Sequence, residues 1–170
     1  MGFLTHLLYK KYKYQPFPWL WWVRKPTLQE KHMNMEETVA HFKEDFDLFP
    51  TANDKLEYIF DLGKKHTTLP DAEKNDATYV VGCASDAWLM GECKEGILLL
   101  RGEGTSEMAK GMLTLLLTIF ANRPVDEVLA FDPKKLHDMG IIELLSPVRQ
   151  QSLEAFLNKV YTYANRCKGA

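Results

Sequence analysis

The sequence YVVGCASDAWLMGECKEGILLLRGEGTSEMAKGMLTLLLTI, which spans residues 79–119, decides the fold. It contains three short apolar runs bounded by glycine or small polar residues, and such runs are typical of strands. The runs cover residues 79–81, 87–90 and 97–100, and residues 91–96 form the expected turn between the last two. Apolar side chains then recur at helical spacing from Met108 to Ile119. The stretch therefore predicts a meander of three strands followed by a core helix.

The third run, Ile97–Leu100, is apolar at every position instead of alternating. A strand with this pattern is usually covered on both faces, so we expect helices on both sides of it. Gly102 and Gly104 end the strand, and Thr105 is the expected N-cap of the core helix.

Further helices are predicted on both sides of this stretch in the sequence. Before it, helices should cover residues 36–46 and a second segment from about residue 51 to about residue 65. After it, short helices should start at Pro124 and Pro133, and a long amphipathic helix should follow Ser146. This order predicts an α+β fold, with a small three-stranded antiparallel sheet packed against several helices.

The first 35 residues differ in composition from the rest of the chain. They hold six Lys or Arg against one acid, and they contain the aromatic run Phe17–Trp22. We therefore divide the chain into an N-terminal basic and aromatic extension, residues 1–35, and one globular domain, residues 36–170. The extension is expected to be disordered, docked on the domain, or translated from a start upstream of the true one. Membrane contact through residues 1–25 is an alternative, because such side chains suit an anionic membrane interface.

The charge of the domain excludes one class of partner. The chain has a formal net charge of -2, which leaves -7 for residues 36–170. A general nucleic-acid surface needs clustered Lys and Arg to neutralise phosphates, so we expect no nucleic-acid partner. A protein partner with a basic face fits this charge better.

The three cysteines, Cys83, Cys93 and Cys167, are an odd number at unrelated spacings. We therefore expect neither a disulfide framework nor a CxxC metal knuckle. A reducing cytoplasmic location is the default for such a chain, and no secretory signal is visible in it. The apolar run Phe17–Val23 is far shorter than the roughly 20 residues that a membrane span requires.

Cys83 lies between two predicted strands, directly after Gly82. The glycine allows an unusual backbone conformation and the close approach of another chain, and Ser85 and Asp86 offer turn hydrogen bonds. These residues should present the thiol on a loop. Taken alone, however, a free cysteine is more often a small apolar core residue than a nucleophile, and no basic residue lies within five positions of Cys83.

Four separated stretches occur in the order and spacing of a known protein family, over about residues 38–164. They are Asp54–Gly63, Val81–Trp88, Lys110–Leu113 with Phe131–Pro133 behind it, and Leu145–Arg149. The second contains the pattern G-C-x-S-x-x-W. Together they resemble the SufE family, the sulfur-acceptor proteins that work with pyridoxal-phosphate cysteine desulfurases in iron–sulfur cluster assembly. The resemblance implies a fold like that of the IscU-type cluster scaffold proteins.

The resemblance also implies roles for individual residues. Cys83 would accept a persulfide sulfur from a SufS- or CsdA-like desulfurase, stimulate that enzyme, and pass the sulfur to a downstream cluster scaffold. The supporting loop residues would be Gly82, Ser85, Asp86 and Trp88, and Arg149 would contact the desulfurase. Family members are thought to shelter the free cysteine in an apolar pocket and to expose it when docked, and its expected neighbours here are Val81, Trp88 and Leu89.

The chain departs from the family pattern at several positions. Ala84 stands where Gln is common, Thr105 replaces an acid, Leu144 replaces a frequent His, and Ser152 replaces a Gly. These departures leave the acceptor role intact but leave the identity of the partner open.

By this reading the protein is an accessory sulfur-transfer protein, and we expect neither stand-alone turnover nor a cofactor. We also expect no metal, because structural zinc and iron–sulfur sites usually need four ligands. One alternative is a stand-alone thiol enzyme with Cys83 as nucleophile and a distant His as base. We expect His66 and His137 to be surface residues instead. Another alternative is an interaction-only regulator of a desulfurase, in which Cys83 is incidental.

Overall fold

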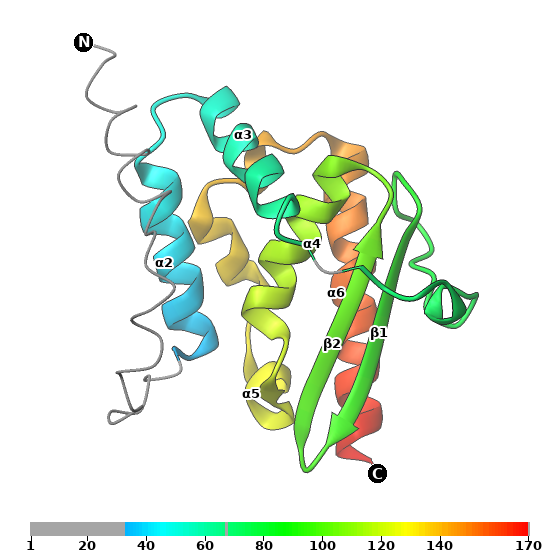
Figure 1. Ribbon diagram of the computed structural model, residues 1–170. Coiled ribbons are helices and arrows are strands. Elements are labelled where there is room, and N and C mark those ends of the chain that lie inside the picture. Colours follow the sequence, from blue (N-terminus) through cyan, green and yellow to red (C-terminus); the bar gives the residue numbers. More distant parts are fainter. Residues whose placement is uncertain (1–32, 67, 170) are drawn as a thin grey trace, which may run out of the picture. The chain divides into compact units, whose positions relative to one another are not determined.

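The computed structural model describes residues 33–66 and 68–169 (Figure 1). The predictions for residues 1–32, namely disorder, docking, an upstream start or membrane contact, lie outside the described residues. The described part begins with helices, continues with a β-hairpin and ends with helices. The predicted α+β class is confirmed.

The sheet is three-stranded and antiparallel, as predicted, but its third strand is a different segment. Strands β1 (Ala87–Lys94) and β2 (Ile97–Gly104) pair along their whole length, and β3 (Arg123–Pro124) pairs with the start of β2. The predicted strand at residues 79–81 is wrong, because this segment contributes an isolated bridge from Tyr79 to Trp88 instead of a ladder. The backbone turns at the next residue, and a ladder cannot continue through that turn.

The hairpin turn is shorter than predicted. It consists of Glu95 and Gly96, both at positive φ (52° and 77°), which is typical of two-residue hairpin turns. Gly91, expected in the turn, lies inside β1, and a Cβ there would lie 2.4 Å from Cγ of Tyr163. This glycine therefore permits close packing of the C-terminal helix on the sheet.

Helices α4 (Glu107–Phe120) and α6 (Pro147–Lys168) pack against one face of the sheet (Figure 1). Leu98 and Leu100 are buried on this face, whereas Ile97 and Leu99 on the other face are half-buried. Among the residues that the structure describes, no α-helix packs on this second face, so the expectation of helices on both faces of β2 is wrong for them. A run of four apolar residues does not distinguish a fully covered second face from a partly covered one.

The N-terminal helices pack around α4. Helix α3 (Ala52–Gly63) crosses α4 at Gly111, where a Cβ would lie 2.1 Å from the carbonyl oxygen of Ile59. Helix α2 (Met35–Asp47) is joined to the end of α4 by the buried Arg123. Its Nε donates to the carbonyl of Ile119 at 2.9 Å, and its Nη2 donates to Oγ1 of Thr38 at 2.9 Å.

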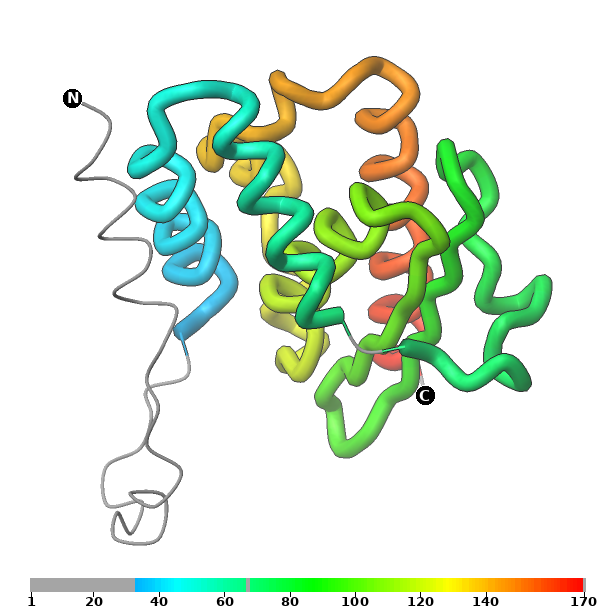
Figure 2. The backbone as a smooth tube through the Cα atoms, turned by 45° about the horizontal axis from the view of Figure 1, so that its top comes forward, coloured from blue at the N-terminus to red at the C-terminus, as the bar shows by residue number. Residues whose placement is uncertain are grey.

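Short helices return the chain from β3 to α6 (Figure 2). They are α5 (Val125–Ala130) and the 3-10 helices η3 (Pro133–Met139) and η4 (Ile142–Leu144), while the 3-10 turn η2 (Asp71–Glu73) precedes the sheet. The predicted starts at Pro124, Pro133 and Ser146 are confirmed as N-caps or first residues. Among the described helices, none is long and apolar enough to cross a membrane.

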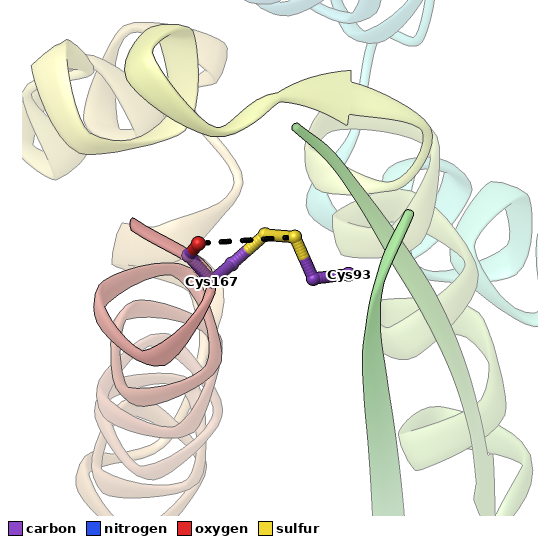
Figure 3. The surroundings of a disulfide bond; sticks show 2 residues. All are labelled: Cys93 and Cys167. Carbon is purple, nitrogen blue, oxygen red and sulfur yellow. Dashed lines mark hydrogen bonds between the residues drawn. A yellow bond between two sulfur atoms is a disulfide. The ribbon is translucent and has the colours of Figure 1, made fainter. Parts of the chain in front are cut away.

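Cys93 and Cys167 form a disulfide, which joins the tip of the hairpin to the last turn of α6 (Figure 3). Their Cα atoms are 5.3 Å apart, within the usual range for such a bond. The expectation that the chain holds no disulfide is therefore wrong. The two residues are 74 positions apart, so only the packing of α6 on the sheet brings them together.

Candidate functional site

Cys83 lies on a loop whose two ends are paired with each other. The amide of Val80 donates to the carbonyl of Ala87, and the amide of Leu89 donates to the carbonyl of Thr78, both at 2.8 Å. Between these pairs Gly82 adopts φ +93°, a conformation that favours glycine. The turn at Gly82 leaves Cys83, the free cysteine of the chain, half-buried.

The Cys83 side chain lines a cavity of about 260 Å³ between the loop and helices α4 and α6. The apolar lining residues are Met108, Met112 and Leu116 of α4 and Leu153 and Phe156 of α6. The polar lining residues are Ser85, Ser106, Arg149 and Ser152. Cys83 therefore lies at a mostly apolar, partly open cavity that also contains hydroxyl groups.

The predicted neighbours of Cys83 are not the ones that line this cavity. Val81 is 81% exposed, and Leu89 is buried in the core. Trp88 packs its ring edge-on against Tyr79, with Nζ of Lys74 6.0 Å from the ring centroid. Apart from Cys83, Ala84 and Ser85, the residues that line the cavity come from Ser106 and from helices α4 and α6, so the helices supply most of the shelter.

The residues that follow Cys83 hold the loop by hydrogen bonds to three different partners. The amide of Ala84 donates to Oγ of Ser152 at 2.8 Å, and the hydroxyls of Ser85 and Ser106 are 3.0 Å apart. The carbonyl of Asp86 accepts from the amide of Thr105 at 2.9 Å.

Two of these contacts correct the predicted helix cap. Ser106, not Thr105, is the N-cap of α4, and its Oγ accepts from the amide of Ala109 at 3.1 Å. Thr105 is occupied with the carbonyl of Asp86, so one polar residue fixes the loop and the next caps the helix. The Asp86 carboxylate also accepts from the hydroxyl of Tyr79 at 3.0 Å, and this bond raises the pKa of Tyr79.

The N-terminal ends of two helices and one cation lie at the cavity. The first turns of α4 and α6 both line it, and the N-terminal ends of helices favour anions. Arg149, exposed in the first turn of α6, lies at the same cavity. The lining residues include one cation and no carboxylate.

The structure thus brings Cys83, Ser85 and Arg149 together at the cavity. Gly82 turns the backbone before Cys83, and Asp86 and Trp88 support the loop from outside the cavity. The sequence did not identify Ser106, Ser152 or the apolar walls as site residues. The helical spacing of Met108 and Met112 marked only a core stripe, and no local signal showed that this stripe faces the loop.

Neither histidine considered as a base lines the cavity. His66 is half-buried rather than on the surface, with Nε2 2.7 Å from the carbonyl oxygen of Gly102 and Nδ1 3.0 Å from Oγ1 of Thr114. Burial lowers the pKa of His66. His137 is exposed and its Nδ1 is 2.9 Å from a carboxylate oxygen of Glu143, as expected for a surface residue. The described residues contain no cluster of His, Cys, Asp and Glu that could hold a metal ion.

Comparisons with known proteins place the chain in a family context. A family model described as "SufE: Fe-S metabolism associated domain" matches residues 40–164. An uncharacterized SufE-like protein of Rhizobium meliloti is 26% identical over 126 residues, covering 71% of this chain and 90% of that protein. A second uncharacterized SufE-like protein, from Rhizobium etli, is 25% identical over 122 residues, covering 69% and 82%.

The fold also has a solved counterpart. The solution structure of a hypothetical protein from Thermus thermophilus matches with a TM-score of 0.66 at 17% identity, covering 78% of this chain and 97% of that one. At this identity the match shows a shared fold and nothing about activity.

Proposed function

This chain belongs to the SufE family, and from that premise we propose that it is a persulfide sulfur carrier that works with a pyridoxal-phosphate cysteine desulfurase. In this proposal Cys83 takes the sulfur, the interaction stimulates the desulfurase, and the sulfur passes to an iron–sulfur cluster scaffold. The protein acts as an accessory factor in the cytoplasm and needs no cofactor of its own.

The chemistry is a thiol–disulfide exchange with sulfur in place of a second thiol. The Cys83 thiolate attacks the outer sulfur of the partner's cysteine persulfide, and a new S–S bond forms on Cys83. The S–S bond of the partner breaks, and its cysteine leaves as a thiolate. No external oxidant or reductant is consumed, because the transferred sulfur keeps its oxidation state.

The single observation that carries the proposal is the position of the free thiol at the apolar cavity. Apolar walls on the inner side of a half-buried thiol reduce the access of water-borne oxidants and thiols, which would otherwise oxidise or strip a persulfide. The volume of about 260 Å³ exceeds the roughly 30 Å³ that one water molecule occupies, so an added sulfur atom fits without repacking the walls.

The charge at the cavity supports the same role. A terminal persulfide carries negative charge when it is deprotonated, and the N-terminal ends of α4 and α6 favour an anion at this place. Arg149 adds a cation at the rim. We therefore assign Arg149 to the desulfurase-facing side of the site, where it can contact the partner or the transferred sulfur.

The outer surface next to the site suits a protein partner. Val81 is 81% exposed and Val148 is 55% exposed, although both are apolar. Val81 precedes Gly82 and Cys83, and Val148 precedes Arg149. A desulfurase that docks over Cys83 would cover both valines, and this burial would stabilise the complex.

Stimulation of a cysteine desulfurase tests the proposal. The Cys83→Ser variant should fold like the wild type, because it exchanges one atom in a half-buried side chain, but it should not stimulate turnover. A Cys93→Ser and Cys167→Ser double variant is the matched control, and it should stimulate fully. Full stimulation by Cys83→Ser would favour an interaction-only regulator, and turnover of a thiol substrate without any desulfurase would favour a stand-alone enzyme.

The Cys93–Cys167 pair bears on the cytoplasmic location. In a reducing compartment the glutathione pool would hold many such pairs as two thiols. Trapping the thiols with an alkylating reagent at the moment of cell lysis reports their state. Two alkylated residues, Cys93 and Cys167, are the result that a cytoplasmic protein predicts.

A further inference from the structure

One face of α6 holds the Cys83 loop through hydrogen bonds to its backbone. Lys159 donates from Nζ to the carbonyls of Ala77 and Tyr79, at 2.9 and 2.6 Å, which lie before Cys83. Ser152 accepts from the amide of Ala84, which directly follows Cys83. Ser152 and Lys159 are seven residues apart, two helical turns, so they share a face of the helix.

The tip of the loop lies directly on this face. A Cβ at Gly82 would be 3.7 Å from Cβ of Ala155, one turn along α6 from Ser152. The backbone on either side of the Cys83 side chain is therefore seated on α6, and the orientation of the thiol follows from that seating.

The hydroxyl of Ser152 makes a second hydrogen bond, as a donor, and this bond orients it to accept from the Ala84 amide. It donates to the carbonyl of Val148 at 3.1 Å, so its single proton is committed to the helix backbone. Its lone pairs are then directed away from that carbonyl, and one of them accepts the Ala84 amide at 2.8 Å. The geometry therefore uses both capacities of one hydroxyl and fixes the direction of the loop contact.

We propose that Ser152 is a positioning residue that latches the Cys83 loop in its sheltered position. The proposal rests on the function proposed above. It adds a residue of α6 that controls how readily Cys83 leaves the cavity.

The Ser152 contact is the point at which the loop can open at the lowest cost. The segment before the tip is held by the cationic Lys159, and hydrogen bonds to charged groups are the stronger kind. The segment after it is held by more than one contact: the hydroxyl of Ser85 bonds that of Ser106, and the carbonyl of Asp86 accepts from both the amide and the hydroxyl of Thr105. Between them, Ala84 is exposed and has one neutral bond to Ser152, and Gly82 provides a hinge.

The test measures the access of Cys83 and the protection of the Ala84 amide in three variants of the full chain. Ser152→Ala removes the acceptor, and Ser152→Thr keeps a hydroxyl at the same position. Thr162→Ala is the matched control, because the Thr162 hydroxyl makes the same bond to the carbonyl four residues earlier, at 2.8 Å, but faces solvent. Alkylation of Cys83 by iodoacetamide and hydrogen exchange at Ala84 are the readouts, with the Cys93–Cys167 disulfide left intact.

Loss of one neutral hydrogen bond should raise the open population of the loop about fivefold. We expect both rates to rise by about that factor in Ser152→Ala, to return to the wild-type values in Ser152→Thr, and to stay unchanged in Thr162→Ala. Equal rates in Ser152→Ala and the wild type, an equal increase in Thr162→Ala, or no recovery in Ser152→Thr would overturn the latch.

Sulfur uptake separates the latch from the function on which it rests. With a limiting amount of desulfurase, Ser152→Ala should take up sulfur up to about fivefold faster than the wild type. A wild-type protein that takes up no sulfur contradicts the proposed function, whereas alkylation and exchange still decide whether Ser152 holds the loop. If the wild type takes up sulfur, and Ser152→Ala shows the same rates of sulfur uptake and of Cys83 alkylation as the wild type, the latch is contradicted but the proposed function is not.

Discussion

Replacement of Gly82 by alanine should displace Cys83 from its cavity while leaving the rest of the fold in place. Gly82 has φ +93°, where a residue with a Cβ is strained. The added methyl group would lie 3.7 Å from Cβ of Ala155, which is an ordinary contact. The cost therefore comes from the backbone and not from a clash, and the loop can relieve it by changing the conformation around Cys83.

The magnitude follows from two opposing effects. A non-glycine residue in such a conformation costs roughly 1–3 kcal/mol, and the loss of glycine from the unfolded chain returns about 0.4–1 kcal/mol. The net loss of unfolding free energy should be about 1 kcal/mol. With a urea slope of about 2 kcal/mol/M, the unfolding midpoint should fall by about 0.5 M.

Gly96→Ala is the matched control. Gly96 lies in the hairpin turn at φ +77°, and a Cβ there has no neighbour within 4 Å. Alanine at this position should therefore have a backbone cost similar to that of Gly82→Ala. The turn lies at the far end of β1 from Cys83. Urea unfolding followed by circular dichroism should show a similar loss for both variants. Alkylation of Cys83 should accelerate in Gly82→Ala alone. Wild-type stability and wild-type alkylation in Gly82→Ala, or faster alkylation in Gly96→Ala as well, would refute the reasoning.

Three further predictions concern other parts of the chain. Replacing Cys93 and Cys167 by serine should lower the unfolding free energy by up to about 4 kcal/mol, as expected for a 74-residue separation. Alkylation of Cys83 should not change. An unchanged urea midpoint would show that the disulfide contributes nothing to stability. Burial lowers the pKa of His66 below its ordinary value of 6.5. Below pH 6.5 the imidazole therefore binds a proton more readily in the unfolded chain than in the folded one. As the pH falls from about 7 to about 5, the wild type should lose stability relative to His66→Gln. Urea midpoints of the two proteins across this range measure the effect, and a constant difference would contradict it. A chain that starts at Met33 should keep both its fold and its sulfur uptake, and loss of uptake would assign residues 1–32 to the functional unit.

The sequence predicted the elements whose signals are local. The helix at residues 52–63 begins directly after Thr51, within the predicted segment, and the core helix follows the spacing of its apolar residues. Residues 79–81 resemble a strand because the β-branched Val80 and Val81 favour one, whereas strand pairing depends on the backbone that follows. Gly82 turns that backbone, and its φ cannot be read from residue type alone.

The candidate site was only partly predictable for the same reason. Cys83 and Arg149 were found through motifs, which are contiguous in the chain. The cavity walls and the Cys93–Cys167 disulfide join segments that are far apart in the sequence, and they exist only because α6 packs on the sheet beside α4. Ser152 was visible as a departure from the family pattern, but its contact with the Ala84 amide depends on that packing.

The central claim is that Cys83 accepts sulfur, and mass spectrometry tests it most directly. The protein is incubated with a cysteine desulfurase and free cysteine, and its intact mass and its cysteine peptides are then measured. The account predicts a gain of one sulfur atom located on Cys83, with Cys93 and Cys167 unmodified and no gain in Cys83→Ser. No gain with any desulfurase tried, or sulfur spread equally onto Cys93 or Cys167, would contradict the account.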